Sequence, residues 1–178
     1  MAGFAFRKNL HGTSEVPALL EFIGKNSIIF TVGDAVRMNT SGFLDLSEAN
    51  EQVMGIVQTV VDTNGLPVTP DSGTTNTWTM ASDNQTVALR KVQIVPAFGD
   101  YAFSTDSDTT ITTADLGVYF NVNATSDGVV TAGQSATIGT LMFQCIGLDP
   151  NGDADASMGL YRIVASQMAQ VTIATVAA

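Results

Sequence analysis

The chain has 178 residues, of which 45% are hydrophobic and only 13% are charged, and its formal net charge is −10. Soluble proteins usually carry about 25% charged residues, so neutral polar side chains must supply most of this surface. Between Lys91 and Arg162 every charged residue is an aspartate, which repels phosphate backbones and argues against nucleic-acid binding. The sequence also shows no signal peptide and no apolar run long enough to cross a membrane as a helix.

Two aromatic and two basic residues, Phe4, Phe6, Arg7 and Lys8, lie before the first pattern that is typical of a strand. On an extended arm over residues 1–15, the rings would fill pockets of a partner and the cations would meet its carboxylates. The alternative is that Phe4 and Phe6 pack against their own core. We favour the arm because chain ends are untethered by default, and we therefore expect the body to fold without residues 1–8.

Residues 33–57 form the pattern from which the fold class can be inferred. Val36 and Met38 alternate with polar residues, which indicates a half-buried strand, and Gly42 ends a turn that favours a positive φ. A return strand is expected over residues 43–46. Residues 53–57 are a short, nearly continuous apolar run, which is typical of a buried central strand.

The next segment contains a tight turn and a tryptophan. Asn64-Gly65 is a strong turn signal, and a loop rich in proline and glycine follows it. Trp78 lies in a threonine-rich strand beyond this loop. We interpret Trp78 as a lid on the core, with an exposed contact residue as the alternative.

Along residues 87–95 the alternation of apolar residues changes phase. Val87 and Leu89 fall on one face of an extended strand, whereas Ile94 falls on the other. A slip of one residue inside a strand is what a β-bulge produces. The sequence therefore predicts a bulge near Arg90-Lys91.

The order of elements in residues 33–57 appears again in residues 117–148: an alternating strand, a glycine turn, a short return and an apolar strand. A single capped helical turn is predicted just before this copy, stopped by Gly117. We infer a first β unit over residues 16–98, a second over 99–170 and a tail over 171–178, with one compact domain over 16–170 as the alternative. The prediction is an all-β, barrel- or sandwich-like body with no helix beyond about three turns.

Groups suited to catalysis are scarce. His11 is the only histidine and Cys145 the only cysteine, so a nucleophile–base pair would depend on one imidazole near the chain end. We therefore expect no enzymatic activity and no cofactor. One acidic stretch has polar residues at alternating positions, as in a calcium loop, but it lacks the glycine and glutamate positions of an EF-hand, which favours a plain acidic turn. These residues are Asp149, Asn151, Asp153 and Asp155.

Several stretches together resemble capsid decoration proteins of tailed bacteriophages, also called cement, stabilisation or auxiliary head proteins. They are FRKNLHGTSEVP, GDAVRMNTSGFLDL…VMGIV, VVDTNGLPV, SDNQTVALRKVQIVP and FQCIGLDP…GLYRIVASQ. The resemblance covers most of residues 4–167. It implies a β-barrel-like virion protein on the outer surface of the head, which bridges neighbouring capsomers against the pressure of the internal DNA.

The resemblance also implies partners. The major capsid protein is the expected partner, and a homo-oligomer, a dimer or trimer, is expected on the capsid lattice. No membrane or nucleic acid takes part and no catalytic residue carries over. The idea of an anchoring arm carries over to Phe4, Phe6, Arg7 and Lys8, which become the expected capsid-binding residues.

The alternative function is a β-domain of a phage head fibre or tail that binds a host receptor or glycan. Its contact residues would be Trp78 and Tyr101, because aromatic rings stack on sugars and anchor interfaces. A decoration protein binds empty shells in near-stoichiometric number, whereas a receptor-binding domain attaches to cells. This difference separates the two functions.

Overall fold

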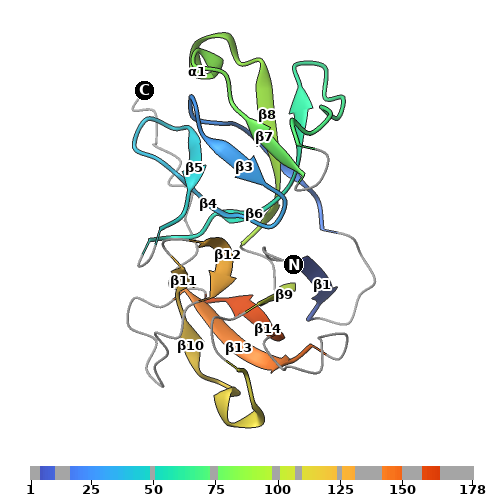
Figure 1. Cartoon of the computed structure of the whole chain (residues 1–178), viewed down its shortest axis with the longest axis vertical. Helices are drawn as coiled ribbons and strands as arrows, with labels where there is room; N and C mark the ends of the chain where they lie inside the picture. Colours follow the sequence, from blue (N-terminus) through green and yellow to red (C-terminus); the bar gives the residue numbers. More distant parts are fainter. Residues whose placement is uncertain are drawn as a thin grey trace, which may run out of the picture.

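The computed structural model describes residues 5–10, 17–48, 51–72, 76–97, 101–106, 110–123, 126–130, 142–149 and 158–164. It confirms the all-β prediction: two five-stranded antiparallel sheets and two smaller ladders hold most of the regular structure of these residues (Figure 1). Neither large sheet closes on itself, so the body is sandwich-like and is not the closed barrel that was one form of the expectation.

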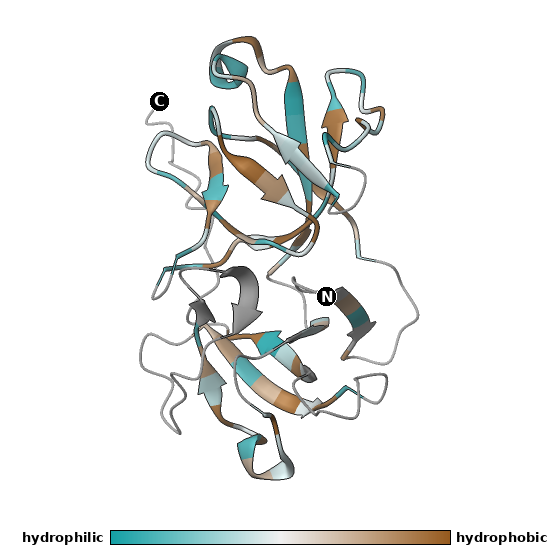
Figure 2. Cartoon of the chain, in the orientation of Figure 1, coloured by the Kyte–Doolittle hydropathy of each residue, from teal (hydrophilic) through white to brown (hydrophobic). Residues whose placement is uncertain are grey.

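The first sheet has the strand order β2-β8-β6-β4-β5 and lies in the upper half of Figure 1. Its strands are β2 (Leu20–Ile23), β4 (Ala35–Met38), β5 (Leu44–Leu46), β6 (Gly55–Asp62) and β8 (Arg90–Pro96). A ladder of β3 (Ile29–Thr31) and β7 (Thr77–Thr79) packs against it through Phe30 and Trp78. Figure 2 shows β3 mainly in hydrophobic colours, whereas the start of β8 is hydrophilic.

The second sheet has the strand order β1-β9-β14-β13-β10 and lies in the lower half of Figure 1. Its strands are β1 (Ala5–Asn9), β9 (Tyr101–Asp106), β10 (Tyr119–Phe120), β13 (Phe143–Leu148) and β14 (Met158–Ile163). A ladder of β11 (Val122–Asn123) and β12 (Ser126–Val130) extends from the β10 side. The chain passes from the first sheet to the second between Pro96 and Tyr101, and only β1 joins the second sheet from the N-terminal side.

The predicted turns are confirmed where glycine was expected to take a positive φ. Gly42 has φ +81° and Gly65 has φ +79°. The Asn39 side-chain oxygen accepts hydrogen bonds from the backbone N–H groups of Ser41 (2.9 Å) and Phe43 (3.0 Å), which fixes the turn between β4 and β5. These bonds join the two strands in the register that puts their apolar residues on the core side.

The capped helical turn is also confirmed, as the short 3₁₀ helix η1 (Thr113–Asp115). Thr112 forms a capping box with Asp115, because each side chain binds the backbone N–H at the other end of the turn. Gly117 follows with φ +85°. Within the described residues the only other helix is α1 (Asn84–Val87), so no helix there is longer than about one turn.

The central strands are buried on both faces at one end of the first sheet. Ile56 on β6 and Val95 on β8 belong to a core shared with the second sheet. Their neighbours Val57 and Ile94 belong to the core beneath β3 and β7. This double burial explains the continuous apolar run in residues 53–57, because a strand covered on both faces needs no polar side.

The bulge predicted near Arg90-Lys91 is wrong. Val87 ends α1 and Leu89 precedes the strand, so the change of phase lies outside β8. β8 pairs with β2 without any shift in register. The extra residue is on the neighbouring strand β6, at Gln58, where the register with β8 shifts. Sequence periodicity placed a helical residue and a loop residue in a strand, which created an apparent slip.

The two sheets repeat one strand order. In chain order, β2, β4, β6 and β8 of the first sheet match β9, β10, β13 and β14 of the second, and both sets pair in the same sequence across the sheet. The bulge recurs as well: β6 shifts register at Gln58 and β13 shifts at Ile146, each against its neighbour in the same position. These matches support the two related β units that the sequence predicted.

Three pairs of hydrogen bonds at the matching strands are also equivalent. They are Gly33 N to Val57 O (2.9 Å) with Gly117 N to Cys145 O (2.8 Å), Met54 N to Val36 O (2.7 Å) with Met142 N to Phe120 O (3.0 Å), and Ala97 N to Met54 O (2.8 Å) with Val164 N to Met142 O (2.9 Å). Equivalent registers allow each position of one sheet to be compared with its counterpart in the other.

Candidate functional site

The expected capsid-binding segment is strand β1 of the second sheet. β1 pairs antiparallel with β9, with Phe6 opposite Phe103. The Phe6 ring is half-buried and makes edge-to-face contacts with Tyr101 (5.6 Å between centroids) and Phe103 (6.3 Å). The prediction of a free arm is therefore corrected for residues 5–9: an aromatic that can reach its own core packs there, which was the alternative weighed.

Arg7 links β1 to β9 and to the residue that follows β13, through Ser104 and Asp149. Its Nε donates to the Ser104 hydroxyl (2.7 Å) and to the Asp149 carboxylate (3.1 Å), and its Nη2 lies 3.1 Å from the same carboxylate oxygen. The Asp149 side chain is 1% exposed and that of Arg7 is 36% exposed. A charge-assisted pair of this kind holds the strand in one position, because a buried carboxylate left alone is costly.

Of the four candidate calcium residues, the structure describes only Asp149. Asp149 is used in the ion pair with Arg7. Asn151, Asp153 and Asp155 lie outside the described residues, as do Phe4, His11 and the side chain of Lys8. In the part of the chain that the structure describes, no three or more histidine, cysteine, aspartate or glutamate side chains gather in a possible metal site.

The two predicted aromatic contact residues are buried to different extents. Trp78 is 3% exposed, and its indole N–H donates to the Val68 carbonyl (2.8 Å). The interpretation as a core lid is therefore right, and the alternative of an exposed contact is wrong. Tyr101 is half-buried and its ring meets Phe6 edge to face. The glycan-binding alternative needed two exposed aromatic rings, whereas Trp78 is buried and Tyr101 is partly covered by Phe6.

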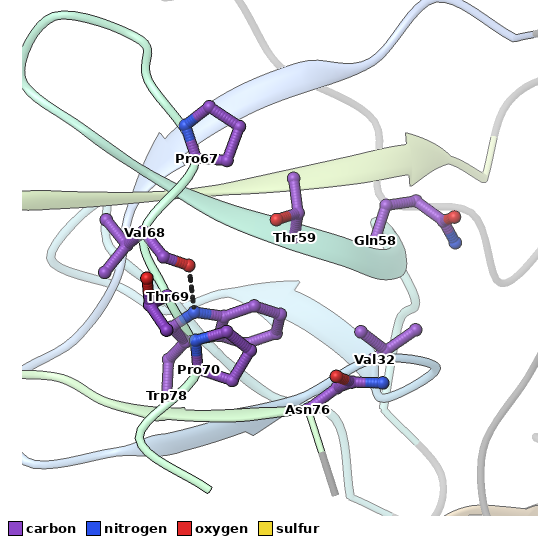
Figure 3. A pocket seen from close by; sticks show the side chains of 9 residues that line it. All are labelled: Val32, Gln58, Thr59, Pro67, Val68, Thr69, Pro70, Asn76 and Trp78. Carbon is purple, nitrogen blue, oxygen red and sulfur yellow. Dashed lines mark hydrogen bonds between the residues drawn. The ribbon is translucent and has the colours of Figure 1, made fainter. Parts of the chain in front are cut away.

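A shallow hollow of about 440 Å³ lies beside Trp78, between the loop that follows β6 and the strands β6 and β7 (Figure 3). No charged side chain lines this hollow. Its residues are Val32, Gln58, Thr59, Pro67, Val68, Thr69, Pro70, Asn76 and Trp78. The bulge at Gln58 places an amide at its rim, but that amide already donates to the Val57 carbonyl (3.2 Å). The hollow is lined by apolar and neutral polar groups and has no charged side chain to orient a ligand.

Cys145 is buried in β13, and its thiol donates a hydrogen bond to the Gly147 carbonyl of the same strand (3.5 Å). Burial raises the pKa of the thiol, a hydrogen bond with the Gly147 backbone opposes this rise, and the negative charge of Asp115 adds to it. The reactive form of cysteine is the thiolate, so these surroundings make the sulfur a poor nucleophile.

We expect Cys145 in the native protein to react with a soluble disulfide reagent at pH 8 at least about a hundredfold more slowly than in the unfolded chain, because it is buried and protonated. Because the thiol pKa is raised in the folded state, the contribution of Cys145 to stability is complete at pH values below 9.0, the pKa in the unfolded chain. This contribution is lost as the pH rises through the folded pKa. Spectroscopic thiol titration with and without urea measures the rates. Equal rates in the two states would contradict this assignment, and Cys145→Ala provides the blank.

Comparisons with known proteins give no match to this chain: no family model, no curated protein and no solved structure is similar to it. No helix in the described ranges is long and apolar enough to span a membrane. Function must therefore be inferred from the sequence pattern and from the geometry given above.

Proposed function

We propose that this protein is a decoration protein of a tailed-bacteriophage capsid, bound to the outer surface of the head. Its partner is the major capsid protein, and it sits on the lattice as a small homo-oligomer, a dimer or trimer. It stabilises the shell by bridging neighbouring capsomers. The proposal assigns no catalytic residue, cofactor or nucleic-acid contact. The sequence resemblance to such proteins and the all-β body support it.

The observation that carries the proposal is the repeated unit. Both sheets have the same strand order, the same bulge position and equivalent hydrogen bonds, so one chain presents two versions of one scaffold. They are joined by a common core that contains Ile56 and Val95 from the first sheet and Phe103 and Tyr161 from the second. Their separation is therefore held by packing and not by a flexible linker.

A repeated scaffold with a fixed spacing suits a lattice. A capsid offers the same surface many times at regular distances. A ligand with two linked contact faces binds the second site at a high effective concentration, which raises avidity without a new contact. A chain that holds two neighbouring shell subunits in this way also opposes their separation, which is the mechanical task of a cement protein.

The surface is compatible with a large protein contact. Only 13% of the residues are charged, and several large apolar side chains are exposed. The most exposed of these are Ile29 (54%), Leu66 (62%), Leu89 (48%) and Leu116 (48%). Single exposed apolar residues are normal on any protein, so they support the proposal only together with the low charge and the repeat.

The decisive experiment mixes the purified chain with emptied phage heads and follows co-sedimentation. We expect near-stoichiometric binding that saturates at a fixed number of copies per shell subunit, and a higher temperature for shell disruption in decorated heads. Electron microscopy of negatively stained heads with and without the protein shows the added density. An acidic β-protein of similar size is the matched control for charge-driven adsorption. Attachment to host cells without any binding to heads would reject the proposal in favour of receptor recognition.

A further inference from the structure

The two sheets differ at one edge. In the second sheet, β1 covers the outer edge of β9. The matching strand of the first sheet is β2, which is the end strand of its sheet: within the described ranges only β8 pairs along it, and the chain meets β5 only beyond its end, at the Gly24–Leu44 bridge. An end strand presents unpaired backbone N–H and C=O groups, which can pair with another extended segment. The repeat therefore contains one filled edge and one open edge of the same kind.

The registers of the two sheets show which residues of the first sheet correspond to the segment that pairs with β1. Leu20 lies opposite Ile94 on β8, and Phe103 lies opposite Tyr161 on β14, which is the counterpart of Ile94. Residues 18–21 therefore correspond to residues 101–104, the segment that pairs with β1.

Exposure differs sharply between these matched positions. Leu19 is 40% exposed, whereas its counterpart Ala102 is 0% exposed. Glu21 is exposed, whereas its counterpart Ser104 is 0% exposed. The outer edge of residues 18–21 thus has an exposed leucine and no described segment beside it, whereas β1 covers the corresponding edge of the second sheet, and such an edge suits an added strand.

Charge indicates what kind of strand fits. In the second sheet, Arg7 of β1 donates to the Ser104 hydroxyl at 2.7 Å. The counterpart of Ser104 is Glu21, whose carboxylate accepts from Gln93 (2.8 Å) and lies 3.7 Å from the Lys91 ammonium. The Glu21 side chain is still 37% exposed. An arginine in the place of Arg7 would meet a carboxylate there, which is a stronger acceptor than a hydroxyl.

We propose that the outer edge of β2, formed by residues 18–21, binds an extended strand of the major capsid protein that carries an apolar residue followed by arginine, antiparallel to β2. This inference rests on the proposed function, since it names the contact through which the shell is held. The donor is not the β1 strand of a second copy, because Phe6 and Arg7 are held by their own body. A second β2 edge is also disfavoured, since it would bring another Glu21 carboxylate to the same place.

The test uses a synthetic peptide with the sequence of residues 4–10 as the probe, because β1 is the strand known to fit the sister edge. We expect the labelled peptide to bind the full chain, and a peptide with glutamate in place of the arginine to lose binding. Leu19→Pro removes an edge N–H and lies just outside the β2–β8 ladder. Glu21→Lys reverses the charge. Each variant should weaken peptide binding by about tenfold or more.

Glu48→Lys is the matched control, because it makes the same charge change at an exposed position away from β2 and should alter affinity less than about twofold. Peptide binding that survives both edge variants, or a peptide that displaces β1 from β9, would overturn the inference. Head binding by the same variants separates the two proposals. If the wild type and both variants decorate heads equally, the edge is not the contact and the proposed function stands. If the wild type binds no heads, the function fails and the peptide result still decides the edge.

Discussion

Removing residues 1–8 is expected to lower the melting temperature by about 10 °C or more, since each kcal/mol is worth about 2–4 °C in a chain of this size. The truncation deletes most of β1 and exposes the edge of β9. The loss of the half-buried Phe6 ring costs about 2 kcal/mol of stability. The loss of Arg7 leaves the buried Asp149 carboxylate without this partner, which typically costs about 3–5 kcal/mol. This total approaches the whole stability of many domains, about 5–15 kcal/mol.

Point variants separate the two contributions. Arg7→Met should destabilise more than Phe6→Leu, because it removes a cationic partner of the buried Asp149 carboxylate, whereas leucine keeps most of the apolar contact. Adding Asp149→Leu to Arg7→Met should restore part of the loss, since both charges are then gone. Thermal unfolding followed by circular dichroism measures the melting temperature of the full chain, the truncated chain and these three variants. A truncated chain that melts within about 2 °C of the full chain would instead support the free arm that the sequence favoured.

Gly55→Ala is expected to destabilise the protein by about 3 kcal/mol or more, because the site is overpacked by a single methyl group. A Cβ at Gly55 would overlap the Val95 carbonyl oxygen and lie 2.7 Å from the Ile94 side chain. The carbonyl belongs to the neighbouring strand β8, so it cannot move without breaking the pairing of β6 with β8. Urea denaturation of the variant measures the change in the free energy of unfolding.

Gly147→Ala is the matched control for this substitution. Gly147 lies in β13, the counterpart of β6, and a Cβ there would meet the Leu160 side chain at 3.5 Å, an ordinary contact. We expect a change within about 1 kcal/mol, because the new methyl group fits without moving the backbone. Similar losses for both alanine variants would mean that strand flexibility, and not steric overlap, explains the glycine at position 55.

The sequence pattern predicted the features of the fold that depend on residues close together in the chain, such as turns and the buried central strand. The turn glycines Gly42, Gly65 and Gly117 were found because a positive φ leaves a compositional signal within a few residues. The central strand was found because double burial removes polar residues from a short run. The prediction of two units rests on the same kind of signal, since these local patterns recur in the same order along the sequence.

Contacts between distant residues could not be predicted. Arg7 and Asp149 are 142 residues apart in the sequence, and no periodicity connects them. The N-terminal segment therefore looked untethered, although its partner strand is β9. The phase change before β8 was misread because a short helix and a strand can place apolar residues at similar spacing. For Trp78 the sequence allowed both a buried and an exposed position, because the Val68 carbonyl that accepts its indole hydrogen bond lies across a loop.

The position of β1 has a consequence for synthesis of the chain. Strand β1 is made before the other described strands, but its hydrogen-bonding partner Ser104 is 97 residues later and the carboxylate that holds Arg7 is 142 residues later. Strands β2 to β8 can pair as soon as they emerge, because all of their sheet partners precede residue 97. Contacts that are distant in sequence form late and slow folding. Strand β1 must therefore wait for the second unit, and its ion pair with Asp149 can form only after β13 has been made.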